Sequence, residues 1–177
     1  VEARDVGQAA IALVPGDINI VQWQAMAYLG QGKLKEAREV IRASIDRGNP
    51  APAVAAFFGG YQEVSWALED PERQLLFRLT PAAFDNDRAW WGQTLAIAYW
   101  QQGDAATARA YADSALPATK VQMAASPTDG QTLGLHALML AYTGKKAEAI
   151  AEAKRTGRPV VAVGTTSVRV LESAAAE

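Results

Sequence analysis

The chain has 177 residues, 50% of them hydrophobic, and its 17 Lys and Arg against 19 Asp and Glu give a net charge of −2. This balance provides no basic field for nucleic acid or anionic lipid, and the lack of cysteine excludes disulfides and thiolate metal sites. With one histidine and no catalytic motif, we expect no catalytic residues, no metal and no cofactor. No apolar run reaches the roughly 20 residues of a membrane span. We therefore expect no membrane partner and a cytoplasmic location, with an extracytoplasmic arm of a signalling protein as the open alternative.

The alanine-rich composition predicts closely packed helices, because alanine favours helix and lets neighbouring helices approach. Residues 1–16 come first and have the pattern of the second helix of a hairpin, ending before Pro15. Because the first helix of that hairpin is missing and the chain does not begin with Met, we expect a fragment of a longer array. The open half-repeat could pair with a second copy to give a homo-oligomer.

One pattern then occurs three times along the chain. Each copy has a small residue, a bulky residue three positions later, a Gly four after that and an Ala five further on. The copies are residues 25–37, 96–108 and 137–149, with their glycines at Gly32, Gly103 and Gly144. Glycine adopts the left-handed conformation that ends a helix, so each copy predicts a helix, a tight turn and a second helix.

The stretch between the first two copies predicts a degenerate hairpin at residues 51–84. We expect helices over residues 52–68 and 71–79, with Phe84 packed beneath the following linker. Gly59 and Gly60 fall inside the first of these helices, where they would either allow close packing or produce a kink.

The last 20 or so residues have a different pattern. The run Val160 to Val163 is typical of a strand, Gly164 of a turn, and residues 166–176 of a helix that could cap the last hairpin. Residues 157–176 resemble a segment of the tRNA ribosyltransferase-isomerase of queuosine synthesis, most closely at residues 162–173. Because this motif covers only about 25 residues, an enzymatic role inherited with it is the minor expectation.

The pattern that occurs three times resembles the tetratricopeptide repeat, a helix–turn–helix unit of 34 residues. That resemblance implies an all-α fold, a right-handed α-solenoid of helical hairpins with a short irregular C-terminal tail. Its boundaries are a half-repeat at 1–16, repeats at 17–50, 51–84, 89–122 and 130–155, and a tail at 156–177. Residues 80–155 also resemble repeat regions of bacterial signalling proteins.

The repeat resemblance also implies a concave groove, lined by fixed positions of each first helix. Its aromatic and amide side chains indicate a peptide or an amphipathic helix as ligand, although aromatic stripes at this spacing equally indicate core. The candidate groove residues are Asn19, Gln22, Met26, Phe57, Tyr61, Trp90, Gln93, Ile97, Trp100, Gln131 and Leu138.

These observations favour a non-catalytic protein-interaction scaffold with a protein or peptide partner and no nucleic acid. One alternative is a regulatory repeat fragment of a bacterial kinase or cyclase-type protein, and the other is a fragment of a tRNA-modifying enzyme. For the remaining polar residues we expect structural roles: His136 packs or faces solvent, and the acidic cluster at Asp85 and Asp87 provides a helix N-cap.

Overall fold

A computed structural model describes residues 2–14 and 16–155, and every regular element in these residues is a helix. The expected all-α fold is therefore confirmed for this part of the chain. The predicted strand, turn and capping helix of the tail lie outside the described residues. The α-helices are α1 (Glu2–Leu13), α2 (Ile18–Leu29), α3 (Leu34–Asp46), α4 (Ala51–Gly59), α5 (Gln62–Ser65), α6 (Asp70–Leu76), α7 (Arg88–Gln101), α8 (Ala105–Ala125), α9 (Gly130–Tyr142) and α10 (Lys146–Arg155), and a 3₁₀ turn η1 spans Pro81–Phe84.

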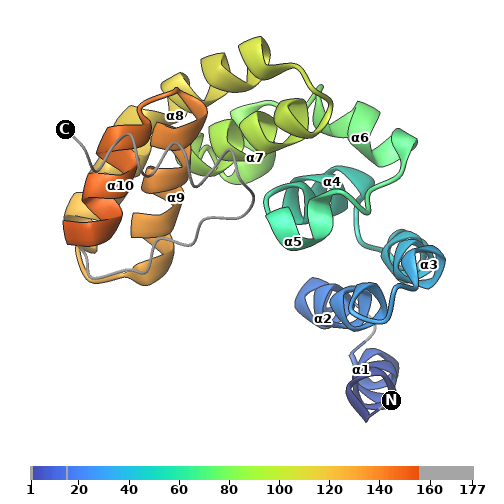
Figure 1. Ribbon diagram of the computed structural model, residues 1–177. Coiled ribbons are helices and arrows are strands. Elements are labelled where there is room, and N and C mark those ends of the chain that lie inside the picture. The colour runs from blue at the N-terminus through green and yellow to red at the C-terminus, as the bar shows by residue number, and fades with distance from the viewer. Residues whose placement is uncertain (1, 15, 156–177) are drawn as a thin grey trace.

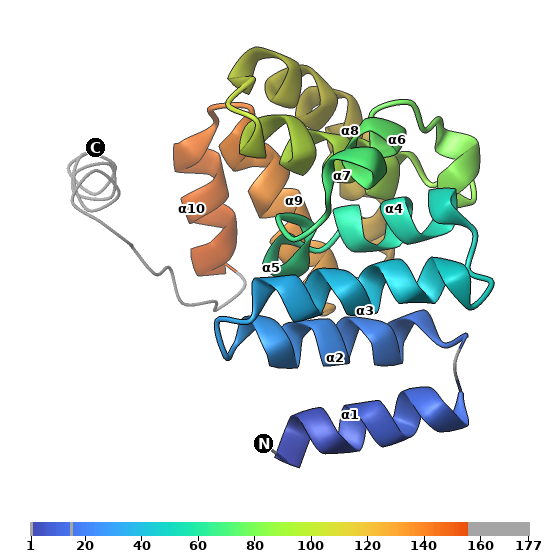
Figure 2. The ribbon, with the colours of Figure 1, turned by 90° about the vertical axis from the view of Figure 1, so that its right-hand side faces the viewer.

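The helices form an arc in which most pack mainly on their neighbours in the sequence, whereas α4 packs mainly on α6 (Figure 1). Seen from the side, α1, α2 and α3 lie nearly parallel in successive layers, with α4 above them (Figure 2). The chain continues through α7 and α8 to α9 and α10 at the other end of the arc. None of the helices in the described ranges is long and apolar enough to cross a bilayer.

Three tight hairpins, α2/α3, α7/α8 and α9/α10, coincide with the three copies of the sequence pattern. Their turns contain Gly32, Gly103 and Gly144 with φ of 72°, 82° and 83°, a conformation that a side chain disfavours. Aspartates at the N-caps of α2, α7, α8 and α9 accept hydrogen bonds from the first free amides of each helix. Local chemistry thus fixes both the starts and the turns of these hairpins.

The alanines of the pattern do lie at helix contacts. Ala25 and Ala37 are fully buried between α2 and α3, and Ala96 and Ala108 are fully buried between α7 and α8. The main core extends from α2 to α7 and includes Phe84, which packs edge-to-face on Trp90 at 5.2 Å between ring centroids. A smaller cluster around Met139 joins α7, α8 and α9.

The degenerate region differs from the expectation of one helix over residues 52–68. α4 ends at Gly59, the chain turns at Gly60, and the short helix α5 follows. A Cβ on Gly59 would lie 2.7 Å from Leu76 Cδ2, and one on Gly60 would lie 2.5 Å from Trp90 Nε1. The two glycines therefore allow α6 and α7 to pack closely against this segment. They also lie where α4 ends, at Gly59.

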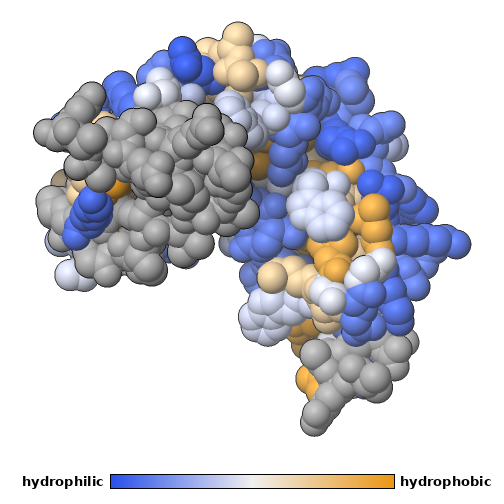
Figure 3. Space-filling model, in the orientation of Figure 1, coloured by the Kyte–Doolittle hydropathy of each residue, from blue (hydrophilic) through white to orange (hydrophobic). Residues whose placement is uncertain are grey.

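Hydrophobic surface gathers on the N-terminal half of the arc, over the part of the molecule that α3 and α4 occupy in Figure 3. Exposed large apolar side chains of this half include Leu13, Trp23, Met26 and Trp66. Hydrophilic residues cover the outer rim of the same face (Figure 3).

Candidate functional site

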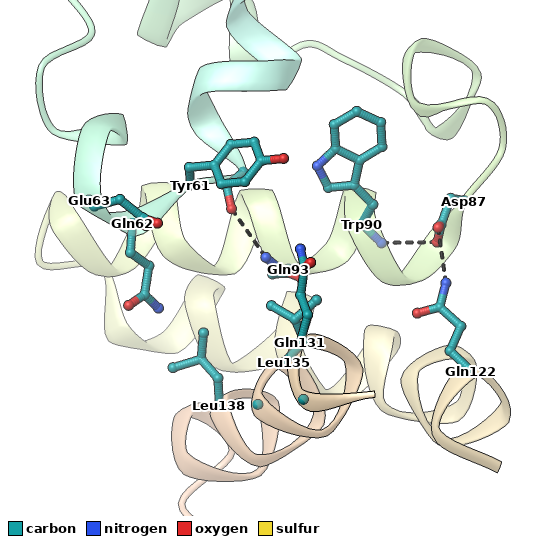
Figure 4. Close-up of a pocket in the computed structure, with 13 residues that line it drawn as sticks. Tyr61, Gln62, Glu63, Asp87, Trp90, Gln93, Gln122, Gln131, Leu135 and Leu138 are labelled. Atoms are coloured by element: carbon teal, nitrogen blue, oxygen red, sulfur yellow. Dashed lines mark hydrogen bonds between the residues drawn. The ribbon is translucent and has the colours of Figure 1, made fainter. Parts of the chain in front are cut away.

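A cleft of about 770 Å³ opens between the α4–α5 turn, α7 and α9. Its walls come from segments far apart in the chain, as Figure 4 shows: one wall is residues 60–63, the floor is α7, and the opposite wall is α9. The lining residues are Gly60, Tyr61, Gln62, Glu63, Asp87, Trp90, Gln93, Gln122, Gly130, Gln131, Gly134, Leu135 and Leu138.

Asp87 closes one end of the cleft and fixes two helices at once. Its Oδ1 accepts hydrogen bonds from the amides of Ala89 at 2.8 Å and Trp90 at 3.0 Å, which caps α7. Its Oδ2 accepts a hydrogen bond from Nε2 of Gln122 in α8 at 3.0 Å (Figure 4). The expected N-cap role of this aspartate is therefore confirmed. The same carboxylate also holds the Gln122 side chain in place at this end of the cleft.

The two aromatic rings of the cleft are held by other aromatic rings. Tyr61 packs on Phe57 with 5.1 Å between centroids, and Trp90 contacts Phe84 edge-to-face. Both lining side chains are half-buried, so each keeps part of its ring surface open. Because their neighbours fix them, these rings are preorganised to contact a ligand.

Glutamine amides provide most of the remaining polar surface. Gln93 is only 5% exposed, and its Nε2 donates to the carbonyl oxygen of Gly60 at 3.2 Å. Gln131 reaches into the cleft from the N-terminal end of α9, opposite Gln93 (Figure 4). An amide both donates and accepts, so the two glutamines can bind a ligand that carries both kinds of group.

The cleft is acidic. Glu63 and Asp87 contribute carboxylates, and none of the residues that line it is Lys or Arg. Across the described parts of the chain, no group of three or more His, Asp or Glu side chains could hold a metal ion. The arrangement suits an uncharged or cationic ligand with hydrogen-bonding edges.

The structure brings together some of the sequence-predicted groove residues and separates others. Tyr61, Trp90, Gln93, Gln131 and Leu138 line the cleft. Sequence reasoning missed several lining residues, notably Asp87, Gln62, Glu63 and Gln122. The recurrence of glutamine along the sequence was a signal for Gln62 and Gln122, whereas no local signal indicated Asp87 or Glu63 as lining residues.

The other predicted groove residues lie elsewhere. Asn19, Gln22 and Met26 belong to α2, outside the cleft, and Phe57 packs in the core against Phe58. Ile97 is 1% exposed, so no ligand could reach it without unfolding α7.

Trp100 and His136 also lie outside the cleft. Trp100 is 51% exposed and leans on Tyr142 with 5.2 Å between ring centroids. His136 is buried, and its Nδ1 lies 2.9 Å from Oγ1 of Thr119, in agreement with the expected packing role.

Comparison with known proteins finds one family at the C-terminal end of the chain. The family model "Queuosine biosynthesis protein" matches residues 127–177. The chain is also 54% identical over 46 residues to the S-adenosylmethionine:tRNA ribosyltransferase-isomerase of Oleidesulfovibrio alaskensis. That alignment covers 26% of this chain and 12% of the relative. No solved structure matches the chain.

These matches correct the functional expectations. The tail resemblance is supported and extends back to residue 127, so it includes α9, α10 and the α9 wall of the cleft. A family of tRNA-modifying enzymes overturns the expected non-catalytic scaffold, the regulatory kinase or cyclase fragment and the exclusion of nucleic acid as a partner. The resemblance to tetratricopeptide repeats is not shown by these comparisons.

Proposed function

We propose that this chain acts in tRNA modification, in the transfer of a ribosyl group from S-adenosylmethionine to tRNA. The match of residues 127–177 to the queuosine biosynthesis family, with 54% identity to a named ribosyltransferase-isomerase, is the observation that carries the proposal. The chain spans 12% of that relative's length, so it supplies one part of such an activity. A tRNA substrate agrees with the cytoplasmic location expected from the sequence.

Exposed cations on α8, in the α9–α10 turn and near the end of α10 support a contact with the tRNA backbone. Lys145 and Lys154 belong to the matched segment and are exposed. Arg109 of α8 is exposed as well, and its Nη2 lies 3.2 Å from the position that a Cβ on Gly144 would take. These three side chains are available to neutralise phosphates, which supply most of the affinity of proteins for nucleic acid.

We further propose that the helical body is a superhelical array of hairpins that presents this C-terminal segment. Support comes from the packing of helices mainly on their sequence neighbours and from the repeated glycine turn. Within the described residues α9 and α10 form the last hairpin of such an array, so the helical part of the matched segment lies at one end of it.

The experiment is to incubate the full chain with a tRNA transcript and S-adenosylmethionine labelled in its ribose. We expect the tRNA to bind and to retain label, and we expect both signals to fall when residues 156–177 are removed. Arg169→Ala, in the motif that resembles the ribosyltransferase-isomerase, should reduce them as well. Arg78→Ala removes an exposed arginine outside the match and is the charge-matched control. If the full chain neither binds tRNA nor labels it, the proposal is wrong.

A further inference from the structure

We infer that the cleft between α5, α7 and α9 binds the base and sugar of a nucleoside and disfavours its phosphate. This inference goes beyond the proposed function, because most of the cleft lies outside the segment that matches the queuosine biosynthesis family. A volume of about 770 Å³ is that of a small-molecule site and is far too small for a folded nucleic acid.

The aromatic side chains indicate a planar ligand. The rings of Tyr61 and Trp90 lie along the same side of the cleft, Tyr61 on the α4–α5 turn toward Glu63 and Trp90 on α7 beside Asp87 (Figure 4). Phe57 and Phe84 hold them in place from behind. Because these rings are already held in place, stacking a base on them costs little side-chain entropy of the protein. Stacking alone does not distinguish between bases, since every base has a π-face.

The amides indicate that the planar ligand is a nitrogen heterocycle. Gln93 is nine-tenths buried and lines the cleft, and its Nε2 is bound to the carbonyl oxygen of Gly60. The Oε1 of the same amide is a hydrogen-bond acceptor, so it can accept from an exocyclic amino group. Gln131, facing it, offers both a donor and an acceptor. Glutamine pairs with two adjacent groups of adenine in this way.

The charges distinguish a nucleoside from a nucleotide. Glu63 is exposed at the rim, Asp87 lies at the far end, and no Lys or Arg lines the cleft. A carboxylate accepts a hydrogen bond from a sugar hydroxyl, whereas it repels a phosphate in the same place. The chemistry therefore fits an adenine-type base with a ribose and without a phosphate, either as a free nucleoside or as an unpaired base of a strand.

The test is equilibrium dialysis of the full chain with adenosine, AMP and a single-stranded adenine oligonucleotide in parallel. We expect adenosine to bind about tenfold more tightly than AMP, because of the two carboxylates. If the oligonucleotide binds more strongly than adenosine, the ligand is an unpaired base of a strand. If adenosine binds more strongly than the oligonucleotide, the ligand is a free nucleoside. Glu63→Gln should reduce the preference for adenosine over AMP.

Two variants test the contacts themselves. Gln131→Leu changes an exposed side chain and should weaken adenosine binding about tenfold, while Trp90→Phe should retain much of the stacking. Gln102→Leu, at an exposed position just beyond α7 and outside the cleft, is the matched control. Thermal melting of each variant separates a lost contact from a lost fold.

Three results would overturn the inference: no binding of adenosine, equal binding by Gln131→Leu and the parent chain, or full displacement of adenosine by methyl glucoside. The last result would identify a simple sugar as the ligand. Because this assay contains neither tRNA nor S-adenosylmethionine, its failure would leave the proposed ribosyl transfer standing. Failure of the tRNA assay would likewise leave the nucleoside site standing.

Discussion

Single side chains connect several elements in this molecule, and Asp87 is the clearest case. One of its oxygens caps α7 and the other holds Gln122 of α8, so its carboxylate stabilises a helix start and a contact between helices. A neutral amide could replace part of this network, whereas a methyl group could replace none of it.

We predict that Asp87→Ala lowers the free energy of unfolding by about 0.5–2 kcal/mol, the usual cost of removing an N-cap. Asp87→Asn should cost less, because asparagine also caps helices. Urea unfolding measures both, and Asp113→Ala, at an exposed aspartate inside α8, is the control. Equal losses for Asp87→Ala and Asp113→Ala would contradict the prediction.

The buried pair of Thr119 and His136 joins α8 to α9. Thr119→Val keeps the shape of the side chain but leaves the 2.9 Å hydrogen bond to the imidazole unmade. We expect a loss of about 1–3 kcal/mol in unfolding free energy, because a buried polar atom loses a partner. Ser114→Ala removes an exposed hydroxyl from the same helix and should change stability by less than about 0.5 kcal/mol. Similar effects of the two changes would argue against a structural role for the pair.

At the scale of elements, the most extensive contact between two helices lies between α7 and α8. Gly92 is buried there, and a Cβ on it would lie 2.8 Å from the Cβ of Ala115 and 3.2 Å from the carbonyl oxygen of Tyr111. The second of these neighbours is backbone, which cannot move aside without shifting α8.

Gly92→Ala should therefore destabilise the fold by about 1–3 kcal/mol through overpacking, although alanine favours helix over glycine. The double variant with Ala115→Gly should recover part of that loss, since it removes the nearer of the two clashing atoms. Chemical denaturation of both variants is the measurement. A Gly92→Ala protein that is more stable than the parent would show that α7 and α8 are not packed as described.

The start of α8 should be sensitive to acid. The amide of Thr107 donates to Asp104 at 3.0 Å, and this hydrogen bond lowers the pKa of the Asp104 carboxyl. A lowered pKa means that the stabilisation is present above the unfolded value of about 3.9 and is lost as pH falls through the folded value. When the pH is lowered from neutral to about 3, the melting temperature of Asp104→Asn should therefore fall less than that of the parent chain. Thermal melts at both pH values measure this difference. An identical loss in both proteins would exclude this contribution.

The elements could be predicted from sequence where their signals were local. The glycine turns at residues 32, 103 and 144 and the small residues of the pattern placed three hairpins correctly. The region from 51 to 84 could not be predicted in the same way, because its helix is broken by the approach of Trp90 and Leu76. Those contacts join residues distant in sequence, and no local pattern contains them.

The site was predictable only in part for a related reason. A periodic rule found Tyr61, Trp90 and Gln93 because they occupy regular helix positions. It also selected Ile97, which is buried on α7, and it missed Glu63, which follows the break after α4. The near-neutral composition carries no signal for a tRNA partner, and in the sequence only the short motif of the tail indicates one.

At the scale of the whole molecule, packing that is mainly between sequence neighbours leaves the ends less protected than the middle. α1 contacts α2 and exposes large apolar side chains such as Leu13, whereas α7 packs on α4, α8 and α9. We expect amide hydrogens of α1 to exchange first and those of α7 last. Hydrogen-exchange mass spectrometry would test this order, and uniform exchange along the arc would be inconsistent with it.

The proposed tRNA contact also belongs to this scale, because it depends on cations from more than one helix. If Arg109, Lys145 and Lys154 neutralise about three phosphates, the slope of log K against log salt should be about −2 to −3. Lys145→Gln should make that slope less negative by about 1. The exposed Lys35→Gln, at the other end of the arc, should leave it unchanged. A slope that is the same for all three proteins would remove Lys145 from the interface.

The cleft has a mechanical consequence for the arc. Gln93 and Gln131 belong to successive hairpins whose first helices, α7 and α9, touch little, because α8 packs against both of them. A molecule hydrogen-bonded to both glutamines would act as a cross-brace, limiting how far the arc can bend at this point. Occupancy of a small cleft would then narrow the range of curvatures of the entire chain, a change in shape that solution scattering can record.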